Sequence, residues 1–385
     1  MRPHQLARVL AVLLTVPPLS MALASPSMAA EEPSEVALRW QETALSTVPF
    51  SPATSLYLAF TSRAVHKAVT QSLRHPDSSE TAAVATAAHD VLIEYFPGAT
   101  SLDATLADSL AGVPDGPAED NGVAIGASAA AGVIADRADD GRGDPSVVYD
   151  KEPGIGVWEP DLRGMATPWY GFVDRLTGGR PVPVDGPDPV GSAAYRADLA
   201  EVQADGAAGA DADKAAVATF FNVNGFALYR RALIGYLRTS PLGLSETTDL
   251  FADLDVSTGE ALRQTWRLKF NYGFWRPTAA IGSDDGDPLT PPQPGWSSVL
   301  PVPPYPEYPS GHGALTAAFA QTVRCHLGDD IPLTLEGAGG TRSYTTLSSI
   351  EDDAFVSRIW GGIHFRDAMD DAYVIGHEVA ARMCD

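Results

Sequence analysis

Helical periodicity, with no alternating strand pattern of comparable length, restricts the fold of this chain more than any other feature of its sequence. After Ser51-Pro52, which has the residue types of an N-cap and a first helical position, apolar residues recur at intervals of three and four. Similar helical patterns cover residues 82–96, 102–110, 122–136, 215–237, 244–274 and 314–326. The sequence therefore predicts a mainly α fold.

Residues 138–212 interrupt this helical pattern and are rich in Gly, Pro and Asp. Trp158 and Trp169 lie within this segment, and such interspersed aromatic residues favour an ordered excursion over a flexible linker. A length of 385 residues allows one or two globular units. We expect a single helical domain over residues 31–385, with an N-terminal scaffold (31–240) that carries the excursion and a C-terminal half (241–385) that carries the functional site.

Residues 1–30 have the layout of a secretory signal peptide. Two arginines begin the segment, an apolar run covers residues 9–16, and small residues suited to cleavage follow before residue 30. The run is far shorter than the ~20 residues that span a bilayer, so we expect a secreted, extracellular protein. In an oxidising compartment Cys325 and Cys384 could form a disulfide, although two buried free thiols would have the same sequence.

The chain is strongly acidic, with 49 acidic and 26 basic residues and a net charge of −23. This charge would repel the phosphates of nucleic acid and anionic lipid surfaces, so we expect no nucleic-acid partner. After the leader no stretch of eighteen apolar residues appears, and we expect no membrane contact once the leader is removed. An anionic ligand must therefore be bound by a local cluster of positive side chains.

Residues 261–281 form such a cluster, with four basic side chains and no carboxylate. Lys269 and Arg276 are seven positions apart, which is two helical turns, and Trp266 shares their face. Pro277 disfavours helix at Arg276, so we expect its guanidinium at a helix end. The alternative is a solvated basic face whose long side chains cover apolar surface.

A proline-rich approach leads to Ser310-Gly311-His312-Gly313, with eight prolines between residues 291 and 309. Ser310 has the residue type and position of an N-cap for the following helix, and the N–H of Gly311 would lie at the positive end of the helix dipole. An oxyanion would bind there. His312 is either a catalytic imidazole with room to reach that anion or a structural histidine at a helix start.

Arg358 and His364 complete the candidate set. A capping box at residues 348–351 predicts a helix that carries Arg358 and ends at Gly361-Gly362, and His364 then precedes the last helix. The sequence has no HExxH motif, no GxSxG elbow around Ser310, and no carboxylate trio or cysteine pair in this set for a divalent metal. The candidate set therefore offers three positive charges, a hydroxyl, a backbone amide and two imidazoles. These are groups that can bind a tetrahedral oxyanion.

Three motifs, Lys269-x6-Arg276-Pro277, Pro309-Ser310-Gly311-His312 and Ser357-Arg358-x5-His364, resemble the signature shared by vanadium-dependent haloperoxidases and the type-2 phosphatidic acid phosphatase superfamily. The resemblance implies a helical bundle that binds vanadate, or phosphate in the same place. It implies that His364 ligates vanadium, or is the nucleophile of a phosphatase, and that His312 is the acid–base group. It also implies that the anion's equatorial oxygens are neutralised by Lys269, Arg276, Arg358, Ser310 and Gly311.

The resemblance leaves three functions open. The first is an exported haloperoxidase that uses hydrogen peroxide, halide and a small organic acceptor, with Lys269 polarising the peroxide. The second is a soluble acid phosphatase with a phosphohistidine intermediate, and the third is a non-catalytic oxyanion-binding protein. Trp266 matches an aromatic residue near the halide region of chloroperoxidases, and Tyr305 stands where chloroperoxidases have Phe and bromoperoxidases have His, so the halide preference stays open.

The sequence also leaves open the surroundings of the two histidines. Glu307, Asp367 and Asp370 either orient the arginines or His364, or are exposed to solvent. Nothing in the sequence indicates the oligomeric state.

Overall fold

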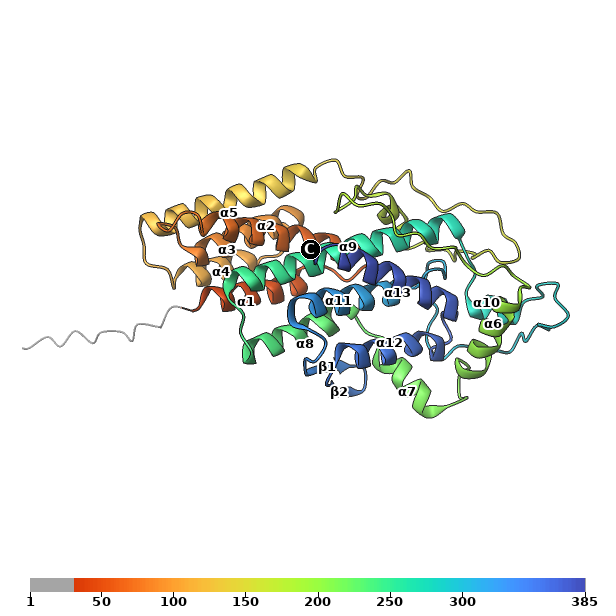
Figure 1. The fold of residues 1–385 in the computed structure, drawn as a ribbon. Coiled ribbons are helices and arrows are strands. Elements are labelled where there is room, and N and C mark those ends of the chain that lie inside the picture. Colours follow the sequence, from red (N-terminus) through yellow and green to blue (C-terminus); the bar gives the residue numbers. More distant parts are fainter. Residues whose placement is uncertain (1–30, 385) are drawn as a thin grey trace, which may run out of the picture.

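The computed structural model describes residues 31–384, and helices make up most of this part of the chain (Figure 1). The predicted mainly α fold is confirmed. The predicted leader, residues 1–30, lies outside the described residues. Between residues 31 and 384, none of the helices is both long enough and apolar enough to cross a membrane.

The N-terminal helices form one end of the molecule, and the first two of them pack against the long helix α9 (Leu244–Tyr272), which runs through both halves (Figure 1). Small residues let these helices approach closely: a Cβ placed on Gly126 would lie 2.6 Å from the carbonyl oxygen of Ala83. The helices of this end are α1 (Pro33–Thr47), α2 (Thr54–Ser72), α3 (Glu80–Tyr95), α4 (Leu102–Leu110) and α5 (Pro117–Asp136).

The excursion over residues 138–212 is ordered and packs on α9. Its short 3-10 helix (Pro168–Phe172) buries Tyr170, whose hydroxyl donates a hydrogen bond to the carbonyl of Gly259 at 3.0 Å. A Cβ on Gly171 would lie 2.4 Å from the backbone nitrogen of Arg267, so only glycine fits this contact. The excursion also contains helix α6 (Ala193–Asp205), which the sequence analysis did not predict.

The single helical pattern over residues 215–237 is in fact two helices, α7 (Ala212–Phe220) and α8 (Gly225–Thr239). Asn224 breaks the pattern because its side chain accepts a hydrogen bond from the N–H of Ala227 and caps α8. A short antiparallel hairpin, β1 (Leu333–Gly337) and β2 (Gly340–Tyr344), was also not predicted. Five-residue strands are too short to stand out against the helical periodicity of the chain.

The C-terminal half places α11 (Gly311–Leu327) beside both α9 and α13 (Arg366–Ala381). Two shorter helices, α10 (Pro277–Gly282) and α12 (Leu347–Trp360), complete it. The predicted capping box at residues 348–351 is wrong: Thr346 caps α12, and Glu351 forms ion pairs with Arg324 and His377. A disulfide joins Cys325, near the end of α11, to Cys384, with the two Cα atoms 5.8 Å apart.

Candidate functional site

The end of α9 positions Lys269 and Arg276. Gly273 adopts a left-handed conformation (φ 61°) that ends the helix, and its N–H bonds to the carbonyl of Lys269. The Lys269 ammonium is fully buried and donates to the carbonyls of Pro306 and Glu307, both at 2.8 Å. Arg276 follows in extended backbone and donates from Nε to the carbonyl of Tyr305 at 3.1 Å. Both cations therefore face the same proline-rich segment.

The start of α11 has the predicted cap. The Ser310 hydroxyl oxygen accepts a hydrogen bond from the N–H of Gly313 at 3.2 Å, and Ser310 is fully buried. Gly311 packs on the indole of Trp266, where a Cβ would lie 3.0 Å from the ring. His312 occupies the first turn and is partly exposed. The N-terminus of α11, with its backbone N–H groups, therefore lies near the cations at the end of α9.

The third motif brings Arg358 and His364 close to Lys269 and Arg276. Arg358, in the last turn of α12, is buried and donates to the carbonyl of Phe221 at 3.3 Å. His364 lies in the connection before α13, and its Nε2 is 3.2 Å from Nη1 of Arg276. The turn between α7 and α8, which the sequence analysis placed inside one helix, is therefore part of the wall of this site.

A buried carboxylate orients His364. Glu307 has 1% of its surface exposed, and its Oε1 accepts hydrogen bonds from Nδ1 of His364 at 2.7 Å and from the N–H of Phe365 at 3.0 Å. Glu307 is thus placed to orient His364, and the alternative that Glu307 is exposed to solvent is wrong. The carboxylate of Asp367 accepts from the N–H of Asp188 instead. Burial raises the pKa of Glu307 to about 8, against the opposing effects of Arg276 and Lys269.

The electrostatics of the site are those of an anion-binding cavity. Within residues 31–384, none of Lys269, Arg276 and Arg358 forms an ion pair with a carboxylate, and Nη2 of Arg276 and Nε of Arg358 are buried without a hydrogen-bond partner. Burial lowers the pKa of Lys269 well below its ordinary value and that of Arg358 to about 10. Buried unpaired cations are costly, and an oxyanion would compensate all three.

Both imidazoles lie within the field of these cations. Burial, followed by Arg358, lowers the pKa of His312 to about 3. Burial, followed by Arg276, lowers the pKa of His364 well below its ordinary value. The side chains predicted from three separate motifs therefore converge, as expected, and both histidines are neutral at neutral pH.

Aromatic rings cover one side of the cations. The ring centroids of Trp266 and Tyr305 are 5.1 Å apart, and the Lys269 ammonium lies 5.8 Å and 5.1 Å from them, respectively. The guanidinium of Arg276 is 5.2 Å from the Tyr305 centroid. These contacts place both residues of the predicted halide region beside the cations.

A largely apolar cavity of about 480 Å³ lies next to the aromatic rings and the start of α11. Gly311 and His312 line it together with Trp266 and Tyr305, and its remaining walls include Phe50, Phe226, Leu262, Leu315, Pro303 and Pro304. It is large enough for a small organic molecule as well as for small anions and peroxide.

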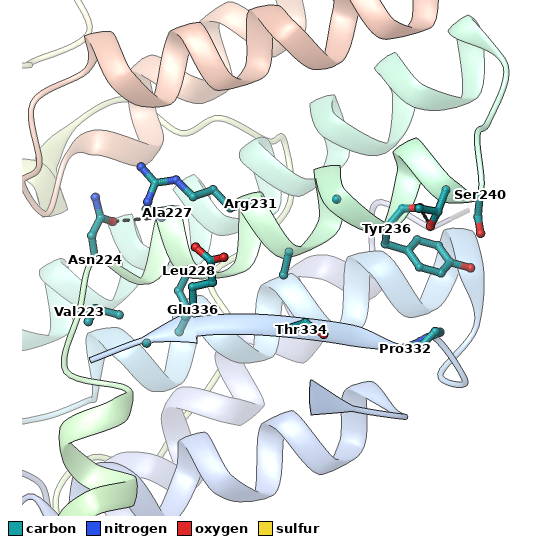
Figure 2. Close-up of a pocket in the computed structure, with 14 residues that line it drawn as sticks. Val223, Asn224, Ala227, Leu228, Arg231, Tyr236, Ser240, Pro332, Thr334 and Glu336 are labelled. Atoms are coloured by element: carbon teal, nitrogen blue, oxygen red, sulfur yellow. Dashed lines mark hydrogen bonds between the residues drawn. The ribbon is translucent and has the colours of Figure 1, made fainter. Parts of the chain in front are cut away.

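A second cavity, of about 590 Å³, lies between α8 and β1 (Figure 2). Arg231, Glu336 and the capping Asn224 line it, and Figure 2 shows Arg231 on the helix and Glu336 on the strand. None of the predicted site residues lines this cavity. We therefore assign the candidate site to the apolar cavity and the buried cations next to it.

Comparisons with known proteins agree with the motifs and the fold. Residues 249–385 match the family model of the VCPO second helical-bundle domain. A vanadium chloroperoxidase from Curvularia inaequalis is 33% identical over 110 residues, which cover 25% of this chain and 18% of that protein. The match thus spans less than a fifth of the curated relative.

Solved structures extend the likeness to the whole fold. A bacterial vanadium-dependent iodoperoxidase superposes with a TM-score of 0.72 at 18% identity, over 91% of this chain and 95% of the other. A holo-type bacterial vanadium-dependent chloroperoxidase superposes with a TM-score of 0.64 at 18% identity, over 94% and 95%. The matched helical-bundle domain, the partial match to a vanadium chloroperoxidase and the shared fold therefore support the resemblance to vanadium haloperoxidases that the three motifs indicate.

Proposed function

We propose that this chain is a vanadate-dependent haloperoxidase that oxidises halide with hydrogen peroxide. The observation that carries the proposal is a set of three buried cations, Lys269, Arg276 and Arg358, which lack carboxylate partners within residues 31–384 and lie beside two neutral imidazoles. A tetrahedral oxyanion fits this donor set. The named relatives, which are vanadium haloperoxidases, support vanadate as that anion.

Bound vanadate would supply a Lewis-acidic vanadium(V) centre at which hydrogen peroxide is activated toward halide. The three cations, the Ser310 hydroxyl and the Gly311 N–H would hold its oxygens. The Nε2 atom of His364 would ligate the metal, because Glu307 holds the opposite ring nitrogen at 2.7 Å and so sets the direction of the ring.

His312 would move the proton of the reaction. With its pKa lowered to about 3, its imidazole is neutral at neutral pH and can accept a proton from hydrogen peroxide. Lys269 would polarise the oxygen that halide attacks, since its ammonium is held in place by two carbonyls. Halide and a small organic acceptor would reach His312 through the apolar cavity past Trp266 and Tyr305.

The proposed activity is tested by reconstitution. Protein dialysed against orthovanadate is expected to brominate a phenolic dye when hydrogen peroxide and bromide are added, and phosphate is expected to compete because it fits the same donors. The untreated protein serves as the control. Absence of bromination, together with hydrolysis of p-nitrophenyl phosphate, would assign the site to a phosphatase instead; binding of both anions without either reaction would leave an oxyanion-binding protein.

Phosphate binding is expected to take up protons at pH 8 to 9. Burial lowers the pKa of Lys269 in the empty site, and a bound anion favours the protonated ammonium and raises that pKa again. The same anion disfavours ionised Glu307, whose pKa is about 8, so Glu307 binds protons on complex formation and affinity for the dianion falls as pH rises through this range; Lys269 adds to the uptake to the extent that its amine is neutral in the empty site. Calorimetry in two buffers of different ionisation enthalpy measures the uptake, and Lys269→Met should reduce it. Net proton release would contradict this account.

A further inference from the structure

The second cavity, between α8 and β1, adjoins the apolar cavity that contains His312. Val223 and Asn224 line both cavities, and Gly225, the first residue of α8, lines the apolar one. The N-terminus of α8 therefore forms the boundary between them. A volume of about 590 Å³ is in the range of cavities that hold small molecules. A molecule bound in the second cavity would thus lie next to the place where hydrogen peroxide and halide are proposed to react.

The helix wall of the second cavity contains a glycine that packing does not explain. Gly235 lies inside α8 (Gly225–Thr239), where glycine is about 1 kcal/mol less favourable than alanine. A Cβ on Gly235 would meet no atom within 4 Å. A Cβ on Gly225 of the same helix would lie 2.4 Å from the Leu315 side chain, so close packing explains that glycine. Gly235 instead leaves open volume in the cavity, as a bound molecule would require.

The two facing walls of the second cavity carry one charge each. Arg231 on α8 and Glu336 on β1 are exposed and line the cavity (Figure 2). Within residues 31–384 neither forms an ion pair: the preceding Arg230 is buried and pairs with Asp255, and the cross-strand partner of Glu336 is the neutral Thr341. A molecule with one carboxylate and one ammonium group would complement both charges.

The surface between these charges and the apolar cavity is mostly apolar. Arg231 is two turns beyond Asn224, about 10 Å along the helix axis, and Ala227 and Leu228 line the cavity between them. Long side chains on a helix point back toward its N-terminus, which brings the guanidinium of Arg231 closer to the apolar cavity. An aromatic amino acid would place its ring on Ala227 and Leu228 and its charged groups beside Arg231 and Glu336.

We propose that the second cavity binds the organic acceptor of the reaction, and that this acceptor is an electron-rich aromatic amino acid. The inference rests on the proposed haloperoxidase function, which supplies hypohalous acid from hydrogen peroxide and halide. A ring carbon takes the halogen from hypohalous acid, and the ring proton that leaves joins the hydroxide to form water. Arg231 and Glu336 determine specificity, because the guanidinium pairs with the carboxylate of the amino acid and Glu336 pairs with its ammonium group.

Binding is tested with three phenols that differ in their charged groups: L-tyrosine, tyramine, which lacks the carboxylate, and 3-(4-hydroxyphenyl)propionate, which lacks the ammonium group. Ligand-observed NMR titration of the full chain needs no vanadate. Arg231→Gln should weaken binding of tyrosine and the propionate about five- to tenfold and leave tyramine unchanged. Glu336→Gln should weaken tyrosine and tyramine to the same extent and leave the propionate unchanged.

Two further variants separate recognition from general effects on the protein. Arg74→Gln removes an exposed arginine outside the cavity and should bind all three phenols as the native chain does. Gly235→Leu should weaken all three, because its side chain fills the cavity. Leucine favours helix over glycine, so the unfolding midpoint of this variant should not fall, and its loss of binding is then not a loss of folding.

Bromination of an equimolar mixture of tyramine and the propionate by the vanadate-loaded protein connects the cavity to the reaction. Relative to the native chain, Arg231→Gln should shift the product ratio about five- to tenfold toward bromotyramine, and Glu336→Gln should shift it equally far toward the brominated propionate. No bromination at all would contradict the haloperoxidase function, while the NMR titrations still test the cavity. A native chain that binds none of the three phenols, or any pattern other than this crossed one, overturns the proposal.

Discussion

His364→Ala is expected to lose vanadate binding and turnover together, whereas His312→Ala should retain most of the binding and lose about 10²- to 10⁴-fold in turnover. His364 is held by Glu307 and contacts Arg276, so its removal would delete the proposed ligand of the metal. His312 is partly exposed in the cavity wall and is proposed to move only a proton. Equilibrium dialysis with vanadate and bromination of a phenolic dye, on the same samples, measure the two effects.

His75→Ala is the matched control for both variants, since this exposed histidine lies outside the cavity and the buried cations. Circular dichroism checks that each variant is folded. Full bromination activity in both His312→Ala and His364→Ala would show that the roles inferred from the motifs are wrong, and equal loss of vanadate binding in both would remove the distinction between ligand and proton carrier.

Glu307→Ala is expected to lower vanadate affinity and turnover by about 10- to 100-fold, the usual effect of losing a carboxylate that orients a ligating histidine. The substitution removes the acceptor for both Nδ1 of His364 and the N–H of Phe365. The ring of His364 can then rotate, and its Nε2 no longer has one direction. Vanadate titration of the variant, followed by steady-state bromination, measures both losses.

Glu307→Gln separates orientation from charge. The glutamine carbonyl oxygen can accept the same two hydrogen bonds, so this variant should retain vanadate affinity within a few-fold of the native protein. We propose Glu307 as a positioning residue, and rescue by glutamine is the readout that a purely structural role would not produce. If glutamine is as damaging as alanine, the negative charge rather than the direction of the ring is what matters. If alanine leaves the affinity unchanged, Glu307 does not position His364.

Local patterns in the sequence predicted the parts of the structure that depend on neighbouring residues. The cap at Ser310 was correct because a serine before a helix bonds within its own first turn. The break between α7 and α8 was missed, although Asn224 is a strong capping residue, because apolar periodicity continues on both sides of it. The capping box at residues 348–351 was wrong because Glu351 finds stronger partners in Arg324 and His377, which are distant in sequence.

The order and chemical types of the anion-binding side chains could be read from the linear chain, because each motif places its residues within one or two turns of a helix end. The pairing of Glu307 with His364 was only one of the alternatives that the sequence left open, since the two are 57 positions apart and their contact exists only where α9, α11 and the connection before α13 meet. Burial likewise arises only when distant segments exclude water together. That exclusion buries Lys269, Arg276 and Arg358 and shifts the pKa values of His312 and Glu307. The buried cations are what make these residues a candidate anion site.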